Sequence, residues 1–265
     1  MNRIDKKFKE LKKLKKKAFI AFITAGYPNL NTTKALVKEL EKRGADLIEL
    51  GVPFSDPLAD GPIIQRASEE SLKKGTNLHK ILKAVKELRC EIKIPLCLMT
   101  YYNPVFRFGE ETFLKSCRES GVDGLIIPDL PPEEGKNLLR QAHKNSVDIV
   151  LFISPTTTKE RIRFISKLAK GFIYYVSLTG VTGARNKLPQ DLIASIKAVK
   201  QITNKPVCVG FGISKREHLK QVYSIADGAI VGSAIVKNIS DNLGKKDLVK
   251  KAGNFVENLL KAKNV

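Results

Sequence analysis

The chain alternates between short apolar runs and longer amphipathic stretches. The apolar runs are rich in β-branched residues, are almost continuously hydrophobic and are bounded by Gly, Pro or Asp. This pattern is typical of parallel strands that are buried on both faces. It predicts eight strands, at 19–23, 47–52, 95–100, 124–127, 149–153, 172–178, 206–210 and 228–231.

The stretches between these runs carry apolar residues at helical spacing on one face. They predict helices at 32–43, 78–88, 110–119, 132–144, 158–169, 188–203, 215–224 and 246–261. A further amphipathic helix is expected over 2–16, before the first strand, with Ile4, Phe8, Leu11 and Leu14 on one side.

Eight strand-then-helix units predict an α/β fold, a single-domain (β/α)8 TIM barrel over residues 1–265. The N-terminal helix over 2–16 is expected to cover the bottom of this barrel. A doubly wound open sheet is the alternative, but the first strand is not followed by the GxGxxG fingerprint of dinucleotide-binding folds.

The chain has 265 residues and a formal net charge of +20. Much of this charge lies at the two ends: residues 1–17 hold Arg3 and eight lysines against Asp5 and Glu10. We interpret it as a solvated lysine-rich surface, because a nucleic-acid site usually adds aromatic stacking residues or a reading motif. We therefore expect no nucleic-acid partner.

Membrane and redox signals are weak in this sequence. It contains no apolar run of about 18 residues that could span a bilayer, and we expect no membrane partner. The four cysteines have no CxxC spacing. We therefore predict a reducing compartment, without disulfides.

The active site of a barrel lies at the carboxyl ends of its strands. Glu49 is the one ionisable residue inside the otherwise apolar second strand, and Asp60 lies in the long loop that follows. A buried carboxyl has a raised pKa and suits proton transfer near neutral pH. Glu49 could instead point between sheet and helices toward a lysine, and Asp60 alone could be a turn residue.

Three glycine-rich segments follow the last three predicted strands, at 179–185, 210–214 and 232–234. Glycines there let backbone N–H groups approach an anion, and a helix N-terminus at 233 would add a favourable dipole. Loops after strands seven and eight form the recurrent phosphate site of barrels. The three segments together predict phosphate binding, although plain turns remain an alternative.

The sequence lacks the residues that Schiff-base and metal-dependent catalysis would require. No lysine stands at the carboxyl end of a predicted strand, which argues against a Schiff base. The three histidines are scattered and no cysteines are paired, so we predict no metal site. The chemistry is expected to use carboxylates and a bound phosphate ester.

The run at 49–62, Glu-Leu-Gly-Val-Pro-Phe-Ser-Asp-Pro-Leu-Ala-Asp-Gly-Pro, resembles the signature of the tryptophan synthase alpha chain family. The similarity continues at 22–28, 99–104, 128–131, 180–183, 210–213 and 232–236. The resemblance covers nearly the whole chain and leaves only the basic ends unexplained.

This resemblance implies a lyase that cleaves indole-3-glycerol phosphate to indole and glyceraldehyde 3-phosphate. Glu49 would be the general acid and base, and Asp60 would bind the indole N–H. Thr182 would hydrogen-bond Asp60 when its loop closes. The other implied contacts are to the phosphate, from Gly183, Gly212, Gly232 and Ser233, and to the indole, from Phe22, Met99, Tyr101, Ile127, Tyr174 and Phe211.

The resemblance also implies a partner, a beta chain in an α2β2 complex that receives indole. This chain would need no cofactor, since pyridoxal phosphate is expected only in the beta partner. The implied docking residues are Pro53, Asp56, Pro57, Asn103, Pro104, Asp129 and Pro131. The expected location is the cytoplasm, or the plastid stroma for a plastid-encoded protein.

Two other functions remain open at this point. A different phosphate-binding barrel, such as an isomerase of histidine or tryptophan biosynthesis, would need another pair of carboxyl or Cys groups. The net charge keeps a nucleic-acid-binding protein as the second alternative, to be tested by salt-dependent retention on DNA.

Overall fold

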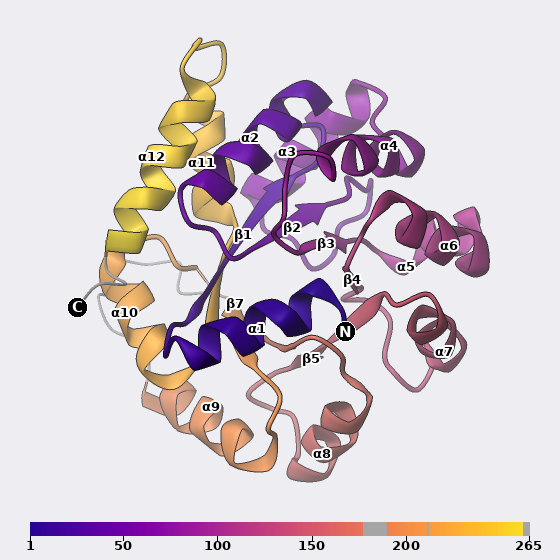
Figure 1. Cartoon of the computed structure of the whole chain (residues 1–265), viewed down its shortest axis with the longest axis vertical. Coiled ribbons are helices and arrows are strands. Elements are labelled where there is room, and N and C mark those ends of the chain that lie inside the picture. The colour runs from indigo at the N-terminus through magenta and orange to yellow at the C-terminus, as the bar shows by residue number, and fades with distance from the viewer. Residues whose placement is uncertain (177–189, 211, 262–265) are drawn as a thin grey trace.

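A computed structural model describes residues 1–176, 190–210 and 212–261. Its eight parallel strands follow one another in sequence order and close into a barrel (Figure 1). The strands are β1 (Ala18–Thr24), β2 (Leu47–Gly51), β3 (Leu96–Met99), β4 (Gly124–Ile126), β5 (Asp148–Ile153), β6 (Ile173–Val176), β7 (Val207–Gly210) and β8 (Gly228–Val231). The closed barrel confirms the predicted fold class and excludes the open doubly wound sheet.

Helices surround the barrel, and α1 lies across the end that faces the viewer in Figure 1. They are α1 (Arg3–Lys13), α2 (Leu30–Lys42), α3 (Pro62–Lys73), α4 (Leu78–Leu88), α5 (Tyr102–Phe108), α6 (Glu110–Ser120), α7 (Lys136–Lys144), α8 (Lys159–Leu168), α9 (Gln190–Ile202), α10 (Arg216–Ile225), α11 (Ser233–Ser240) and α12 (Leu248–Leu260). In the described part of the chain, none of them is both long and apolar enough to cross a membrane.

Two helices, α3 and α5, were not predicted. The buried face of α3 consists of Ala67, Ser68 and Ser71. Small and hydroxylated residues there give no apolar period, although the Ser71 hydroxyl is satisfied by the Ala25 carbonyl at 2.7 Å. Pro62 at the start of α3 was the available signal.

The helix predicted from 132 begins later, at Lys136. Residues 132–134 form a turn, in which the N–H groups of Glu134 and Gly135 both donate to the Pro131 carbonyl at 3.0 Å. Gly135 is the N-cap of α7. A glycine is a poor residue for a helix interior, so the boundary there is physically reasonable.

The N-terminal helix α1 packs against the side chains of the barrel interior. Ile4, Phe8 and Leu11 of α1 pack into the cluster of side chains that fills the barrel interior. A Cβ at Gly124 would come within 2.8 Å of the Ile4 side chain, so glycine at that position makes room for α1.

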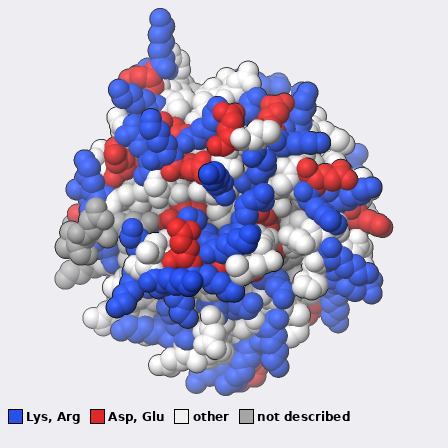
Figure 2. Space-filling model, in the orientation of Figure 1, with Lys and Arg blue, Asp and Glu red and all other residues white. Residues whose placement is uncertain are grey.

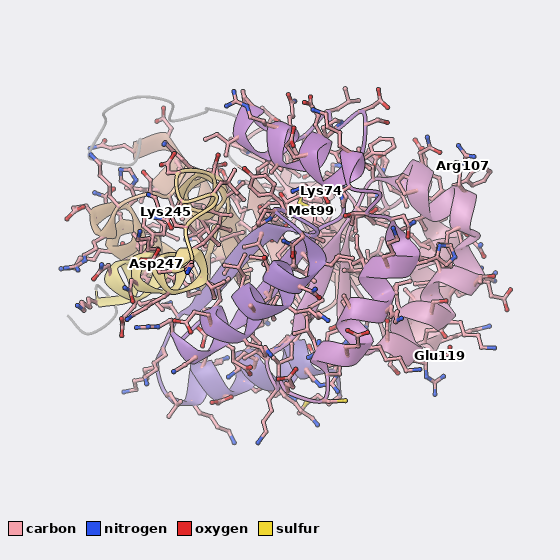
Figure 3. All side chains as sticks on the ribbon, turned by 90° about the horizontal axis from the view of Figure 1, so that it is seen from above. Lys74, Met99, Arg107, Glu119, Lys245 and Asp247 are labelled. Carbon is pink, nitrogen blue, oxygen red and sulfur yellow. The ribbon has the colours of Figure 1, made fainter. Side chains whose placement is uncertain are left out.

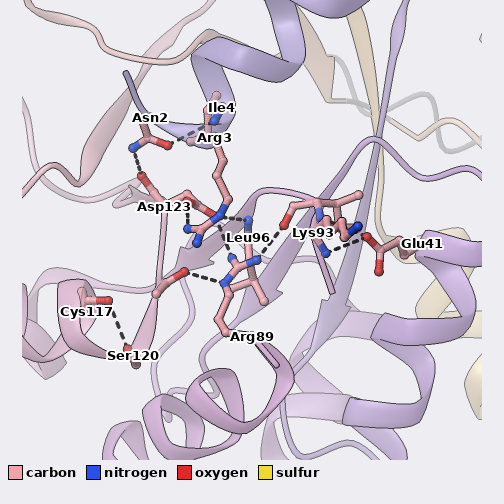
Figure 4. A network of polar contacts seen from close by, with 12 residues as sticks. Asn2, Arg3, Ile4, Glu41, Arg89, Lys93, Leu96, Cys117, Ser120 and Asp123 are labelled. Carbon is pink, nitrogen blue, oxygen red and sulfur yellow. Dashed lines mark hydrogen bonds and ion pairs between the residues drawn. The ribbon is translucent and has the colours of Figure 1, made fainter. Parts of the chain in front are cut away.

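Polar contacts fix α1 at this end of the barrel (Figure 4). The buried carboxylate of Asp123 pairs with Arg3 at 2.8 Å and with Arg89 at 2.7 Å, and it also accepts the Leu96 N–H. The Asn2 side chain donates to the Asp123 carbonyl. The sequence ahead of the first strand is therefore an integral part of the fold.

Charge is spread widely over the face that carries α1. Figure 2 shows Lys and Arg over much of that face, with Asp and Glu among them. Elsewhere on the described surface Lys34 pairs with Glu87 at 2.7 Å and Lys38 with Glu91 at 2.9 Å. This arrangement fits the solvated surface that the sequence predicts.

Candidate active site

A cavity of about 870 Å³ lies at the carboxyl ends of the strands. Of the predicted site residues, Glu49, Asp60, Phe22, Met99, Tyr174, Gly212, Gly232 and Ser233 line it. Two predicted indole contacts, Tyr101 and Ile127, are buried but are absent from the described lining. Thr182, Gly183 and Phe211 lie outside the described residues. The barrel thus brings both carboxylates and most of the predicted phosphate glycines around one space.

Glu49 points into the barrel rather than toward the helices. It lies two residues after Leu47 on β2, so the two side chains share a face, and Leu47 belongs to the interior cluster. Glu49 also pairs in register with Phe22 of β1. Its side chain is 0% exposed, and neither carboxyl oxygen has a hydrogen-bond partner among the described residues. Burial, and secondarily the charge of Asp60, raises the pKa of Glu49 to about 8.

A carboxyl with this pKa is largely protonated at neutral pH and can still give up its proton. It can therefore act as a general acid and, once it has lost its proton, as a general base. No cation compensates its charge among its identified interactions; the carboxylate of Asp60 is its main electrostatic neighbour. This is the arrangement expected of a functional group rather than of a structural ion pair.

Asp60 ends the loop that follows β2 and faces the same cavity. Its backbone N–H donates to Pro57 at 3.0 Å and its carbonyl accepts from Gln65 of α3 at 2.8 Å. The Tyr101 hydroxyl donates to Oδ2 of Asp60 at 3.1 Å. Burial raises the pKa of Asp60, and the hydrogen bond from Tyr101 opposes that shift.

Aromatic rings form the apolar wall of the cavity. Phe152 and Tyr174 lie on neighbouring strands with ring centroids 4.9 Å apart, and Phe22 lines the cavity with them. Burial raises the pKa of Tyr174 strongly, so its phenol stays neutral. Sequence reasoning missed Phe152, although its place two residues after Val150, in the interior cluster, is a signal that it faces inward.

Glycines and the N-terminus of a helix form another part of the cavity lining. Gly212 and Ser214 follow β7, and Gly232 caps α11, whose first residues Ser233 and Ala234 line the cavity. The first N–H groups of a helix have no partner within it, and the helix dipole favours negative charge there. Gly212 has a φ of 32°, in a region that favours glycine.

Among the described lining residues, one lysine comes from outside the strand ends. Lys237 of α11 lines the cavity but pairs with Asp241 on the same helix at 2.7 Å. The α11–α12 connection, marked by Lys245, lies on the opposite side of the barrel from Arg107 of α5 (Figure 3).

The predicted docking residues gather from three segments: the loop after β2, the start of α5 and the loop after β4. Asp56, Asn103, Asp129 and Pro131 are exposed, Pro57 and Pro104 are half-buried, and Pro53 is buried. The Asp129 carboxylate accepts the Tyr102 N–H at 2.9 Å, which ties the third segment to the second. Leu58 is 91% exposed and Phe106 66% exposed, and neither belongs to the predicted docking residues.

Comparison with known proteins gives one consistent answer. A profile of the tryptophan synthase alpha chain family matches residues 8–264. The chain is 48% identical to the tryptophan synthase alpha chain of Thermoanaerobacter sp. (strain X514), with 98% of each chain covered. It is also 48% identical to that of Prochlorococcus marinus subsp. pastoris, over 99% of this chain and 94% of the relative.

Solved structures agree with the sequence comparisons. Tryptophan synthase subunit alpha from Legionella pneumophila str. Paris superposes with a TM-score of 0.93 at 39% identity, covering 100% of this chain and 99% of the other. A chain of tryptophan synthase from M. tuberculosis, in its aminoacrylate-bound form, gives 0.88 at 30% identity with full coverage of both. The chain belongs to the tryptophan synthase alpha chain family, the lyases of tryptophan biosynthesis.

Proposed function

We propose that this chain cleaves indole-3-glycerol phosphate by acid–base catalysis with Glu49 and Asp60 as its working carboxylates. The observation that carries the proposal is the buried Glu49 carboxyl, unpaired among the described residues, in a cavity shared with Asp60 and an anion-binding helix end. The reaction divides into events at the indole ring, at the glycerol chain and at the phosphate.

Glu49 moves the protons. In its acid form it delivers a proton to C3 of the indole ring, which makes the ring an electron acceptor for the bond to the glycerol chain. The resulting carboxylate then takes the proton of the adjacent glycerol hydroxyl as the carbon–carbon bond breaks and the aldehyde forms. The proton count balances, and Glu49 ends in the protonation state in which it began.

Asp60 stabilises the charge on the ring. Protonation at C3 places positive charge on the indole nitrogen, and an ionised Asp60 accepting its N–H would stabilise that state electrostatically. Phe22, Phe152 and Tyr174 would enclose the ring. The other predicted indole contacts and the predicted closure by Thr182 remain predictions.

The phosphate anchors the substrate. The N-terminus of α11, with Gly232 and Ser233, and the segment at Gly212 would bind it. Binding energy at this remote group holds the reacting carbon beside Glu49, which is how enzymes use the non-reacting parts of substrates. Gly183 would complete this site.

The product indole would pass to a beta chain docked on the face around Asp56, Asn103 and Asp129. Leu58 and Phe106 support an interface there, because they are exposed apolar side chains on the same two segments as Asp56 and Asn103. The M. tuberculosis structures are of tryptophan synthase, and we propose the same α2β2 assembly here. Pyridoxal phosphate would belong to the partner, and the location would be the cytoplasm or plastid stroma.

The test is indole release from indole-3-glycerol phosphate by the purified chain. Glu49→Gln should lower the rate by about 10²–10⁴-fold, the range typical of a general acid or base. Glu87→Gln is the matched control, since Glu87 is exposed, pairs with Lys34 and is absent from the described cavity lining. A parent chain that releases no indole, with or without a beta chain, would refute the proposed function.

A further inference from the structure

Tyr101 lies directly behind Asp60 and is buried. Its hydroxyl has two partners on consecutive residues of the loop after β2. It accepts the Ala59 N–H at 2.9 Å and donates to Oδ2 of Asp60 at 3.1 Å. The tyrosine thus reaches across from the end of β3 and holds the loop at the residue that carries the carboxylate.

The direction of the hydroxyl proton follows from these two contacts. A phenol has one hydrogen to donate and lone pairs that accept. The Ala59 N–H can only donate, so it occupies a lone pair. The single hydrogen of Tyr101 is left for the carboxylate of Asp60.

The Tyr101 ring is held as firmly as its hydroxyl. It stacks on Phe54, with ring centroids 5.3 Å apart and an interplanar angle of 29°. Phe54 lies in the same loop as Ala59 and Asp60. The Tyr101 side chain therefore holds that loop at two points. Its ring packs on Phe54, and its hydroxyl bonds to Ala59 and Asp60.

We propose that Tyr101 is a positioning residue for Asp60: it fixes Oδ2 from behind and leaves Oδ1 to meet the indole N–H. Among the described residues, no hydrogen bond to Oδ1 is found, which is consistent with a substrate-facing oxygen. This inference rests on the role proposed above for Asp60. It changes the function of Tyr101 from the ring contact that the sequence resemblance implies.

The hydrogen bond also favours the ionised carboxylate. Burial pushes the pKa of Asp60 upward and the Tyr101 hydroxyl pushes it down. Loss of the hydroxyl should therefore raise the pKa of Asp60. Because the reaction needs the ionised form, the acidic side of the pH–rate profile should move to higher pH.

The experiment is Tyr101→Phe in the full chain, with kcat and KM for indole release measured across pH. The variant keeps the ring and its stack on Phe54. We expect kcat to fall about 10-fold or more, the value of a hydrogen bond to a charged group, while KM changes much less. The acidic limb should shift upward, and carbon-13 NMR should show the same shift for the Asp60 carboxyl.

Tyr102→Phe is the control. Its hydroxyl bonds to Glu110 at 3.0 Å, and the side chain is absent from the described cavity lining. This variant should keep both the rate and the pH profile of the parent. Phe54→Leu removes the stack but keeps both hydroxyl contacts, so it should lower kcat in the same direction by a smaller factor.

The outcomes separate this inference from the function on which it rests. If the parent cleaves the substrate and Glu49→Gln does not, the proposed function stands. If Tyr101→Phe then folds and retains the parent's kcat and acidic limb, the positioning role is wrong. If Tyr101→Phe fails to fold, a parent-like kcat in a folded Phe54→Leu, whose Tyr101 has lost its stack, overturns the inference instead.

Discussion

Glu49 should make the folded chain less stable as the pH rises, and Glu49→Gln should remove that dependence. The carboxyl has a pKa of about 8 when folded, against an ordinary value of 4.5. Between these two values the unfolded chain releases the proton while the folded chain keeps it. An acid with a raised folded pKa therefore adds stability below pH 4.5 that is lost progressively up to pH 8.

The size of the effect follows from the difference between the two pKa values. Each pH unit between them is worth about 1.4 kcal/mol. The loss is near zero below pH 4.5, about 3 kcal/mol at pH 7 and about 5 kcal/mol above pH 8. Glutamine has nearly the same shape and does not ionise, so the variant's stability relative to the parent should rise by about 4 kcal/mol between pH 5 and pH 8.5.

Urea unfolding at several pH values measures this difference. Midpoints should shift while the slope stays constant, since the surface exposed on unfolding is the same. Glu87→Gln serves again as the control and should stay within about 0.5 kcal/mol of the parent at every pH. An equal stability difference between Glu49→Gln and the parent at pH 5 and pH 8.5 would refute the raised pKa and, with it, the physical basis of the proton transfer.

Three further predictions concern other parts of the chain. Asp123→Ala should destabilise the fold by about 3–5 kcal/mol in urea unfolding, because it leaves the half-buried Arg89 without its ion pair; a loss under about 1 kcal/mol would contradict the role given to this network. Asp148→Asn should stabilise the chain more at pH 8 than at pH 4, because burial and, secondarily, Asp5 raise the pKa of Asp148 to about 7; urea midpoints that move equally at both pH values would show otherwise. Gly212→Asp should abolish calorimetric binding of glycerol phosphate with the circular dichroism spectrum unchanged, since it places a carboxylate at the anion site; parent-like affinity would mean that the phosphate binds elsewhere.

Much of this architecture follows from sequence patterns with a simple physical cause. Strands buried on both faces must be apolar, so Glu49 stands out as soon as the strand around it is identified. Barrel geometry then places it at the active end. The sequence left open whether Glu49 faces the interior or the helices. The structure answers this, because Leu47, two residues earlier on the same face of β2, lies in the interior cluster.

Other features depend on contacts between distant residues and leave little trace in the sequence. The buried face of α3 includes Ser68 and Ser71, so it has no apolar pattern in the sequence. Their burial is explained only by the packing of α3 against the end of β1. Tyr101 looks like an apolar pocket residue, and its bond to Asp60 joins positions 41 apart in the chain. Such contacts are set by the closure of the barrel, not by any local pattern.

The most direct test of the proton-transfer account is the fate of the C3 hydrogen. In deuterated water, the exchangeable proton of Glu49 becomes deuterium, and the parent should release indole that carries deuterium at C3, as read by proton NMR. Glu49→Gln has no such group, so in matched reactions its deuterated indole should fall at least 100-fold. Parent-like deuterium transfer to C3 by a folded Glu49→Gln variant would contradict the assignment of Glu49 as the proton donor.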